Sequence, residues 1–204
     1  MPRVPSLTAW LATFFAVNFA LFNVALVVLP TTGPKELGVY ETYRFVTFDA
    51  ASDSWHPMQE AWRYLDAGGG HVYDEIFFER DIKFQYAPTS LLPIELMQRA
   101  FGGDQLKRRT LDGISWLSVV TTAVVTALIF DRAIRRYAPS MAPATGEERW
   151  GRAVLVVLLT LCFYPVARAF GLGQIQTWIN GLFALMVLLW MLDRRIAAGV
   201  AAGL

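Results

Sequence analysis

The sequence predicts an all-α polytopic membrane protein with about four transmembrane helices and one long folded loop outside the cytoplasm. Its 204 residues are 55% hydrophobic and only 17% charged, whereas soluble domains carry roughly 25% charged residues. The apolar residues gather in uncharged runs of membrane-spanning length, and none of these runs has the two-residue alternation of a barrel strand. The net charge of +1 gives no electrostatic basis for nucleic-acid binding.

The first span is predicted at residues 7–29. This stretch of 23 residues has no charged side chain, and a helix of that length exceeds the hydrocarbon thickness of a bilayer, roughly 30 Å. A cleaved signal peptide is the alternative, but its apolar core would be about 7–15 residues long and would precede a small-x-small site. Pro-Thr-Thr-Gly-Pro follows here instead, which favours a retained anchor.

Three further spans are predicted at residues 114–130, 153–167 and 175–192, each near the short end of the spanning range. Their orientation follows from the positive-inside rule. The linker 131–152 is rich in arginine, and further basic residues precede the first span and follow the fourth. The loop 30–110 has fewer Lys and Arg than Asp and Glu. We therefore place the N-terminus and the linker in the cytoplasm and the loop on the other side, in a single membrane domain over residues 1–204.

The long loop is predicted to fold, because it is dense in aromatic residues that disordered segments lack. Residues 56–67 have the pattern of an amphipathic helix, with Pro57 near the start and three glycines after the end. Residues 88–101 are predicted to form a second helix, and the polar Glu95 and Arg99 favour its lying in the membrane interface. A short or re-entrant span is the alternative for this second helix.

Two carboxylates, Asp49 and Asp53, flank the turn that leads into the first loop helix. Asp53 or Ser54 is placed to cap that helix. A carboxylate at the membrane surface can also take a proton from a hydroxyl nucleophile while a charged lipid leaving group departs. Together with His56, the two carboxylates offer the oxygen and imidazole ligands of a divalent ion, although no metal-binding motif is present.

A second polar cluster follows the third span. Arg168 precedes the glycine-rich turn 171–176, which contains Gln174 and opens the fourth span. An arginine beside glycine-rich backbone and a helix N-terminus is typical of a phosphate site, whereas snorkelling to lipid headgroups and turn capping are the alternatives. Lys83 and Tyr86 lie just before the second loop helix, where interface anchoring is the alternative to a substrate contact.

Four short motifs follow one another along the chain: Asp53, Tyr73-Asp74, the segment Phe84-Gln-Tyr-Ala-Pro88, and Gly173-Gln174 at the opening of a helix. This order resembles that of the polyprenyl-phosphate-dependent mannosyltransferases of glycosyltransferase family 87, also called the DUF2029 family. The resemblance covers most of the chain. It implies the GT-C fold, in which a first span is followed by a long extracytoplasmic loop with two juxtamembrane helices and then by further spans.

The resemblance also implies an activity and its participants. Members of the family use a lipid-phosphate sugar as donor and an acidic residue early in the first loop as the base. The position that best matches this base is Asp53, with Asp49 as second choice. Beside it, we expect Arg168, Gln174 and Lys83 to bind the donor phosphate, and His56 and Tyr86 to line the substrate site. A polyprenyl-phosphate sugar and membrane lipids are the expected partners, and the divalent ion is the one cofactor considered.

The chain departs from the family pattern in two respects. Tyr86-Ala87-Pro88 stands where the family usually shows Tyr-Pro-Pro, and members of the family are much longer. Residues 198–204 read like the opening of a fifth span, so the resemblance implies an N-terminal half that lacks its C-terminal half. A non-catalytic membrane subunit, packed against a partner in a larger complex, is the alternative. Under either interpretation we expect a multi-pass protein of the bacterial inner membrane.

Overall fold

The computed structural model describes residues 6–28, 44–45, 47–101 and 108–203, and within these ranges its regular structure is entirely helical. The all-α prediction is therefore confirmed for this part of the chain. The α-helices are α1 (Leu7–Val28), α3 (Trp55–Asp66), α4 (Leu92–Phe101), α5 (Arg108–Tyr137), α6 (Gly146–Leu161), α7 (Tyr164–Leu172), α8 (Gln176–Met191) and α9 (Arg195–Gly203). Shorter segments are the π-helix η3 (Tyr73–Glu79) and the 3-10 helices η4 (Pro88–Leu91) and η5 (Pro139–Met141).

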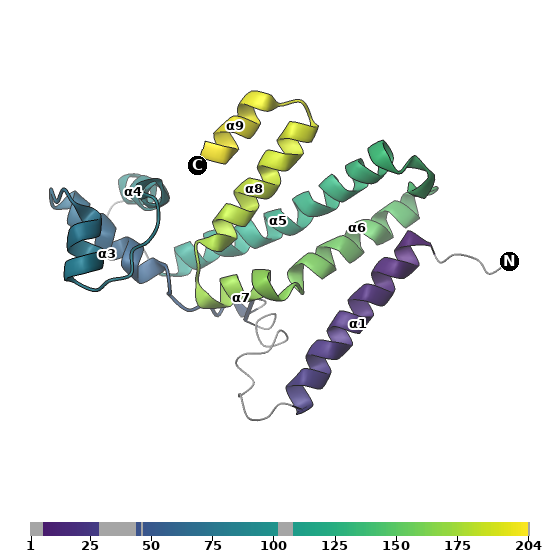
Figure 1. The fold of residues 1–204 in the computed structure, drawn as a ribbon, viewed down its shortest axis with the longest axis horizontal. Coiled ribbons are helices and arrows are strands. Elements are labelled where there is room, and N and C mark those ends of the chain that lie inside the picture. Colours follow the sequence, from purple (N-terminus) through teal and green to yellow (C-terminus); the bar gives the residue numbers. More distant parts are fainter. Residues whose placement is uncertain (1–5, 29–43, 46, 102–107, 204) are drawn as a thin grey trace.

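Helix α5 is the central element of the bundle (Figure 1). It packs against α6 and α8, while α1 packs against α6 and α9 folds back along α8. Its 30 residues make a helix about 45 Å long. Small side chains allow close packing, because Val125 meets Ala184 and Leu188 of α8, and Gly181 of α8 lies against Ser118. The length of α5 separates two polar ends of the bundle.

Membrane-spanning character is concentrated in α5. Within the described residues, it is the helix long and apolar enough to cross a bilayer, over Arg109–Tyr137. Only 33% of its most apolar stretch is buried, whereas the core helix of a soluble protein would be mostly buried. Helices α6 and α7 qualify together as one bent span, while Leu7–Val17 of α1 and α8 are apolar but shorter. Among the described residues there are thus one or two candidate spans, where about four were predicted for the chain.

A break divides the segment that was predicted to span at residues 153–167. Helix α6 ends at Leu161 and α7 begins at Tyr164, with a bend of 51° between them. The cause is Pro165, whose ring would clash with the carbonyl of Leu161 in a continuous helix and which instead lies in the first turn of α7. Helices α5 and α8 cover residues 114–130 and most of 175–192, and residue 29 lies outside the described ranges.

The described part of the long loop packs as a compact helical cluster beside the N-terminal half of α5 (Figure 1). Its core consists of buried side chains from α3, η3, η4, α4 and the segments between them, joined by residues of α5 and of the start of α8: Trp55, Met58, Ala61, Val72, Ile76, Phe84, Leu91, Ile94, Leu111, Ile175 and Trp178. Helix α3 ends where the three glycines predicted it, since Gly68 adopts a φ of 87° just after it. Residues 29–43, 46 and 102–107 of this loop lie outside the described ranges.

Candidate functional site

The segment before α3 is bound to the end of α7 by main-chain hydrogen bonds. The N–H groups of Ala51, Asp53 and Ser54 donate to the carbonyl oxygens of Gly171, Leu172 and Gly173, at 2.8, 3.0 and 3.1 Å. The last carbonyls of a helix lack partners within the helix, so α7 offers acceptors to a second chain segment at this point. Two segments far apart in the sequence are thereby fixed against each other.

Gly173 makes this docking possible. Its φ of 68° is in the left-handed region, which ends α7. A Cβ at this position would lie 2.1 Å from the carbonyl oxygen of Ala51 and 3.1 Å from Nε1 of Trp55. Both the backbone conformation and the close approach therefore require glycine.

The docking places Asp53 beside Gln174. The side-chain Nε2 of Gln174 donates to Oδ2 of Asp53 at 3.0 Å. Asp53 is exposed, so its carboxylate is oriented by the amide and remains open to a molecule at the surface. The sequence predicted Asp53 as the base and Gln174 as one of the residues that bind the donor phosphate. Asp53 precedes α5 in the sequence, and Gln174 follows it.

Ser54 connects the site to Tyr86. The buried Ser54 Oγ accepts from the backbone N–H of Ile175 at 3.1 Å and lies 2.6 Å from the hydroxyl of Tyr86. The hydroxyl of Tyr73 in turn donates to the carbonyl of Tyr86 at 2.6 Å. Ser54 precedes α3 as predicted, but its side chain does not cap α3; it binds the backbone directly before α8 instead. The loop segment around Tyr86 is therefore bound at the place where Asp53, Ser54 and Gln174 meet, which we call the Asp53 corner.

A buried polar layer lies beneath this corner. Trp55 Nε1 donates to Oδ1 of Asp112 at 2.9 Å, and the Trp55 ring stacks on Trp178 with centroids 5.2 Å apart. Trp178 Nε1 and Thr177 Oγ1 both donate to Ser115 Oγ, at 2.9 and 3.1 Å. Each indole N–H has a partner, as a buried donor requires. This layer fixes α3 and α8 on α5.

The other residues predicted for the site surround this corner less closely. Asp49 is exposed and binds Arg44, whose Nε is 3.6 Å from the Asp49 carboxylate. His56 is exposed on the first turn of α3, and Lys83 is exposed before η4. Arg168 is half-buried on α7, about one turn before Leu172.

No group of three His, Cys, Asp or Glu side chains that could hold a metal ion occurs in the described part of the chain. Asp49, Asp53 and His56 thus do not converge on a common point, although they are close in sequence. The neighbour that the structure gives to the Asp53 carboxylate is the side-chain amide of Gln174.

The carboxylate of Glu95 joins the two long helices of the loop. It accepts hydrogen bonds from Trp62 Nε1 of α3 at 2.8 Å and from Arg99 Nε at 2.5 Å. These bonds, that of Trp62 foremost, hold the pKa of Glu95 below its ordinary value, because both stabilise the ionised carboxylate. Glu95, one of the two polar residues that suggested an interfacial helix, thus binds the two loop helices to each other.

Sequence reasoning missed Asp112 and Ser115. Their signal was present: Asp112 is the one ionisable residue between Arg109 and Asp131 on α5, and an isolated carboxylate in an apolar helix marks a buried contact. Ser115 lies three residues further, hence on the same face of α5. The partners, Trp55 and Trp178, were not identifiable, because the pairing depends on how α3 and α8 approach α5.

A comparison with known protein families identifies the family of this chain. The sequence profile of glycosyltransferase family 87 matches residues 84–204, more than half of the chain. Tyr86, Arg168 and Gln174 fall within the matched segment, whereas Asp53 and His56 precede it. No curated protein and no solved structure matches the sequence significantly. The chain belongs to glycosyltransferase family 87.

Proposed function

We propose that this protein transfers mannose from a polyprenyl-phosphate donor to an acceptor at the outer face of the membrane. Membership of a glycosyltransferase family implies a sugar donor. The observation that supports a site at this corner is the hydrogen bond between Asp53 and Gln174. It places an exposed carboxylate of the loop against the segment that carries the family match.

Asp53 is the proposed general base. Its carboxylate takes the proton of an acceptor hydroxyl while that oxygen forms a bond to the anomeric carbon of the donor sugar. The bond between the anomeric carbon and the phosphate oxygen breaks, and its electron pair leaves with the lipid phosphate. The acceptor attacks from the face opposite the phosphate, so the anomeric configuration inverts. Gln174 orients Asp53 for this step.

The phosphate gains negative charge as it departs, and Arg168 and Lys83 are the proposed groups that stabilise it. A guanidinium suits this role, because its planar fork binds two phosphate oxygens at once. Stabilisation of the developing charge is usually the largest contribution to such a rate enhancement. His56, on the first turn of α3, and Tyr86, bound to Ser54, are the proposed substrate-lining side chains.

The experiment is a transfer assay in membranes that contain the full chain, with polyprenyl-phosphate mannose as donor. We expect Asp53→Asn to lower the rate by about 10²–10⁴-fold, the usual contribution of a general base. Asparagine keeps an oxygen that accepts from Gln174, so the docking persists. The matched control is Asp49→Asn, which removes another exposed carboxylate from the same turn and should leave the rate within a few-fold.

Two outcomes would overturn the proposal. Undiminished transfer by the Asp53→Asn variant would remove Asp53 from the mechanism. A donor comparison tests the lipid phosphate: transfer from a nucleotide sugar, with none from polyprenyl-phosphate mannose, would refute the donor class. Arg168→Gln, by contrast, should lower kcat for the lipid donor and should leave Asp53 exposed at the surface.

A further inference from the structure

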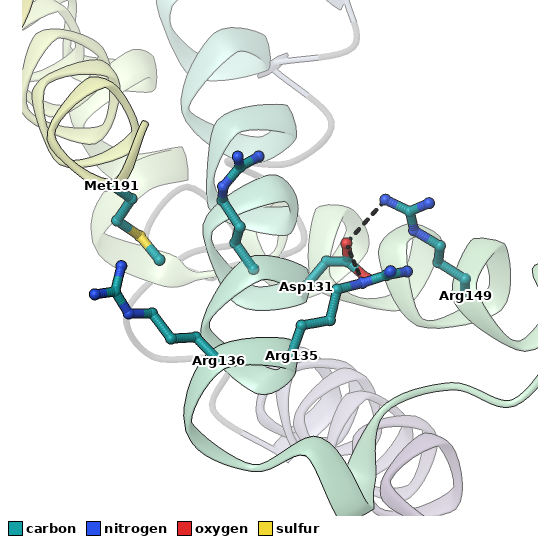
Figure 2. Close-up of a pocket in the computed structure, with 6 residues that line it drawn as sticks. Asp131, Arg135, Arg136, Arg149 and Met191 are labelled. Carbon is teal, nitrogen blue, oxygen red and sulfur yellow. Dashed lines mark hydrogen bonds and ion pairs between the residues drawn. The ribbon is translucent and has the colours of Figure 1, made fainter. Parts of the chain in front are cut away.

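A basic pocket lies at the end of the bundle opposite Asp53. It is an open hollow of about 490 Å³ between the C-terminal part of α5, the start of α6 and the end of α8 (Figure 2). Four arginines, one carboxylate and one thioether line it: Arg132, Arg135, Arg136, Arg149, Asp131 and Met191. We call it the arginine pocket. None of these residues belongs to the proposed catalytic corner.

The arginine pocket has more positive than negative charge. Asp131 accepts from Arg149 at 2.9 Å and lies 3.2 Å from Nε of Arg135, so one carboxylate serves two guanidinium groups. In the described part of the chain, Arg132 and Arg136 have no carboxylate within ion-pair distance. Four arginines against one aspartate leave a local charge of +3. A site with this excess of positive charge attracts anions from outside the chain.

The position of the arginine pocket along α5, relative to the bilayer, indicates which anion is available to it. Between Gly113 and Phe130, α5 has no ionisable side chain. Asp112 and Asp131 are 19 residues apart, which at 1.5 Å per residue is about 28 Å, close to the hydrocarbon thickness of roughly 30 Å. With Asp112 at one surface of the bilayer, the arginine pocket therefore lies at the headgroup level of the other.

The walls of the pocket suit a ligand with an anionic head and an apolar tail. Met191 borders the guanidinium groups, and the neighbouring Trp190 is 66% exposed. Leu128, one turn before Arg132 on α5, is exposed as well. A phosphate bound by the arginines would thus have apolar surface beside it on the bilayer side, which a free phosphate would not use.

We propose that the arginine pocket binds a phosphate group, namely that of an anionic phospholipid in the leaflet opposite the Asp53 site. Guanidinium forks bind phosphate oxygens bidentately, and basic pockets between helices at a membrane surface are typical lipid-headgroup sites. The inference does not depend on the glycosyl-transfer reaction, because it uses no residue of that site. It goes beyond the positive-inside rule, which requires basic residues on this side but no arrangement of them.

The test measures lipid binding to the purified full chain in a neutral maltoside detergent by native mass spectrometry. The probes are phosphatidylglycerol, zwitterionic phosphatidylcholine of the same acyl chains, and inorganic phosphate. We expect saturable binding of phosphatidylglycerol, much weaker binding of phosphatidylcholine, and no displacement by millimolar phosphate. Arg132→Gln together with Arg136→Gln should weaken phosphatidylglycerol binding by about 30-fold, given about 1 kcal/mol for each arginine.

Matched variants separate the pocket from charge in general. Arg194→Gln with Arg195→Gln removes two exposed arginines that follow α8 at the same end but do not line the pocket, and it should change binding less than threefold. Arg132→Lys with Arg136→Lys keeps the charge and the topology signal but loses the planar fork, and it should bind several-fold more weakly. Thermal midpoints close to that of the unaltered protein verify folding.

Each remaining outcome would overturn the proposal. Equal binding of the two phospholipids would show that the headgroup charge is not recognised. Equal effects of the pocket pair and the Arg194–Arg195 pair would reduce the pocket to diffuse surface charge. Displacement of phosphatidylglycerol by inorganic phosphate would assign the site to a soluble phosphate ligand instead of a lipid.

Discussion

The two ends of α5 use charged side chains in opposite ways. Near the start, Asp112 is buried and bound to an indole N–H, and a layer of hydroxyl and indole groups closes over it. Near the end, four arginines line an open pocket, and its one carboxylate pairs with two of them, Arg135 and Arg149. The first end is satisfied by the chain itself, so it can hold a geometry. At the second end, the guanidinium groups of Arg132 and Arg136 are exposed and therefore accessible to an anion from outside the chain.

The largest expected effect comes from a substitution of Gly173 at the end of the bundle that contains Asp112, which we call the closed end. Gly173→Ala forces an alanine into a left-handed conformation, at about 1–3 kcal/mol, and drives its Cβ against the carbonyl of Ala51. We expect a lower thermal midpoint in detergent and, because Asp53 moves away from Gln174, a loss of transfer of about 100-fold.

Gly113→Ala is the control for that substitution. Gly113 is at the same end of α5, and a Cβ there would meet no atom within 4 Å. Alanine inside a helix is favoured over glycine by about 0.5–1 kcal/mol, so this variant should be unchanged or slightly more stable. Equal losses in both variants would show that the close approach at Gly173 is unimportant.

A medium effect is expected when the two aspartates of α5 are compared directly. Asp112→Ala leaves the buried N–H of Trp55 without its acceptor and should lower the free energy of unfolding by about 1–3 kcal/mol. Asp131→Ala removes ion pairs of half-exposed arginines and should lower it by at most about 1 kcal/mol. Denaturant titration in detergent measures both. A larger loss for Asp131→Ala would reverse the distinction between the two ends.

The smallest effect concerns pH at the loop helices of the closed end. The folded pKa of Glu95 lies below its unfolded value, so the bonds to Trp62 and Arg99 contribute fully above the ordinary glutamate pKa of about 4.3. That contribution is lost as the pH falls through the lowered pKa. Thermal midpoints between pH 7 and pH 3 should therefore drop more for the unaltered protein than for Glu95→Gln; parallel curves would contradict the assignment.

The sequence predicted the two loop helices well, because their signals are local. Pro57 at the start, three glycines at the end and apolar residues on one face sufficed for α3. The break at Cys162–Phe163 was predictable from the sequence, since Pro165 is incompatible with a helix that continues from Leu161. It was missed because the residues on both sides of it form one apolar run. Apolarity reports burial in lipid or protein; it does not report continuity of a helix.

The candidate site was only partly predictable for a different reason. The pattern of charges suggested that Asp53 and the turn around Gln174 share one face, and the structure places them in hydrogen-bond contact. The hydrogen-bond partners of Ser54 and Asp112 were not recognisable, because each partner comes from a segment far away in the sequence. Periodicity identifies the buried face of one helix, whereas a hydrogen-bond partner is decided by the packing of two.

The main-chain bonds from Ala51, Asp53 and Ser54 to the end of α7 have a consequence for how the protein can vary in sequence. Since the donors are backbone N–H groups, the side chains of Ala51 and Ser52 are not needed to hold this segment against α7. Substitutions at positions 51 and 52 therefore keep the main-chain attachment, whereas Asp53 and Ser54 also bind Gln174 and the backbone of Ile175 through their side chains. Proline is the exception at position 51, because it has no N–H to donate.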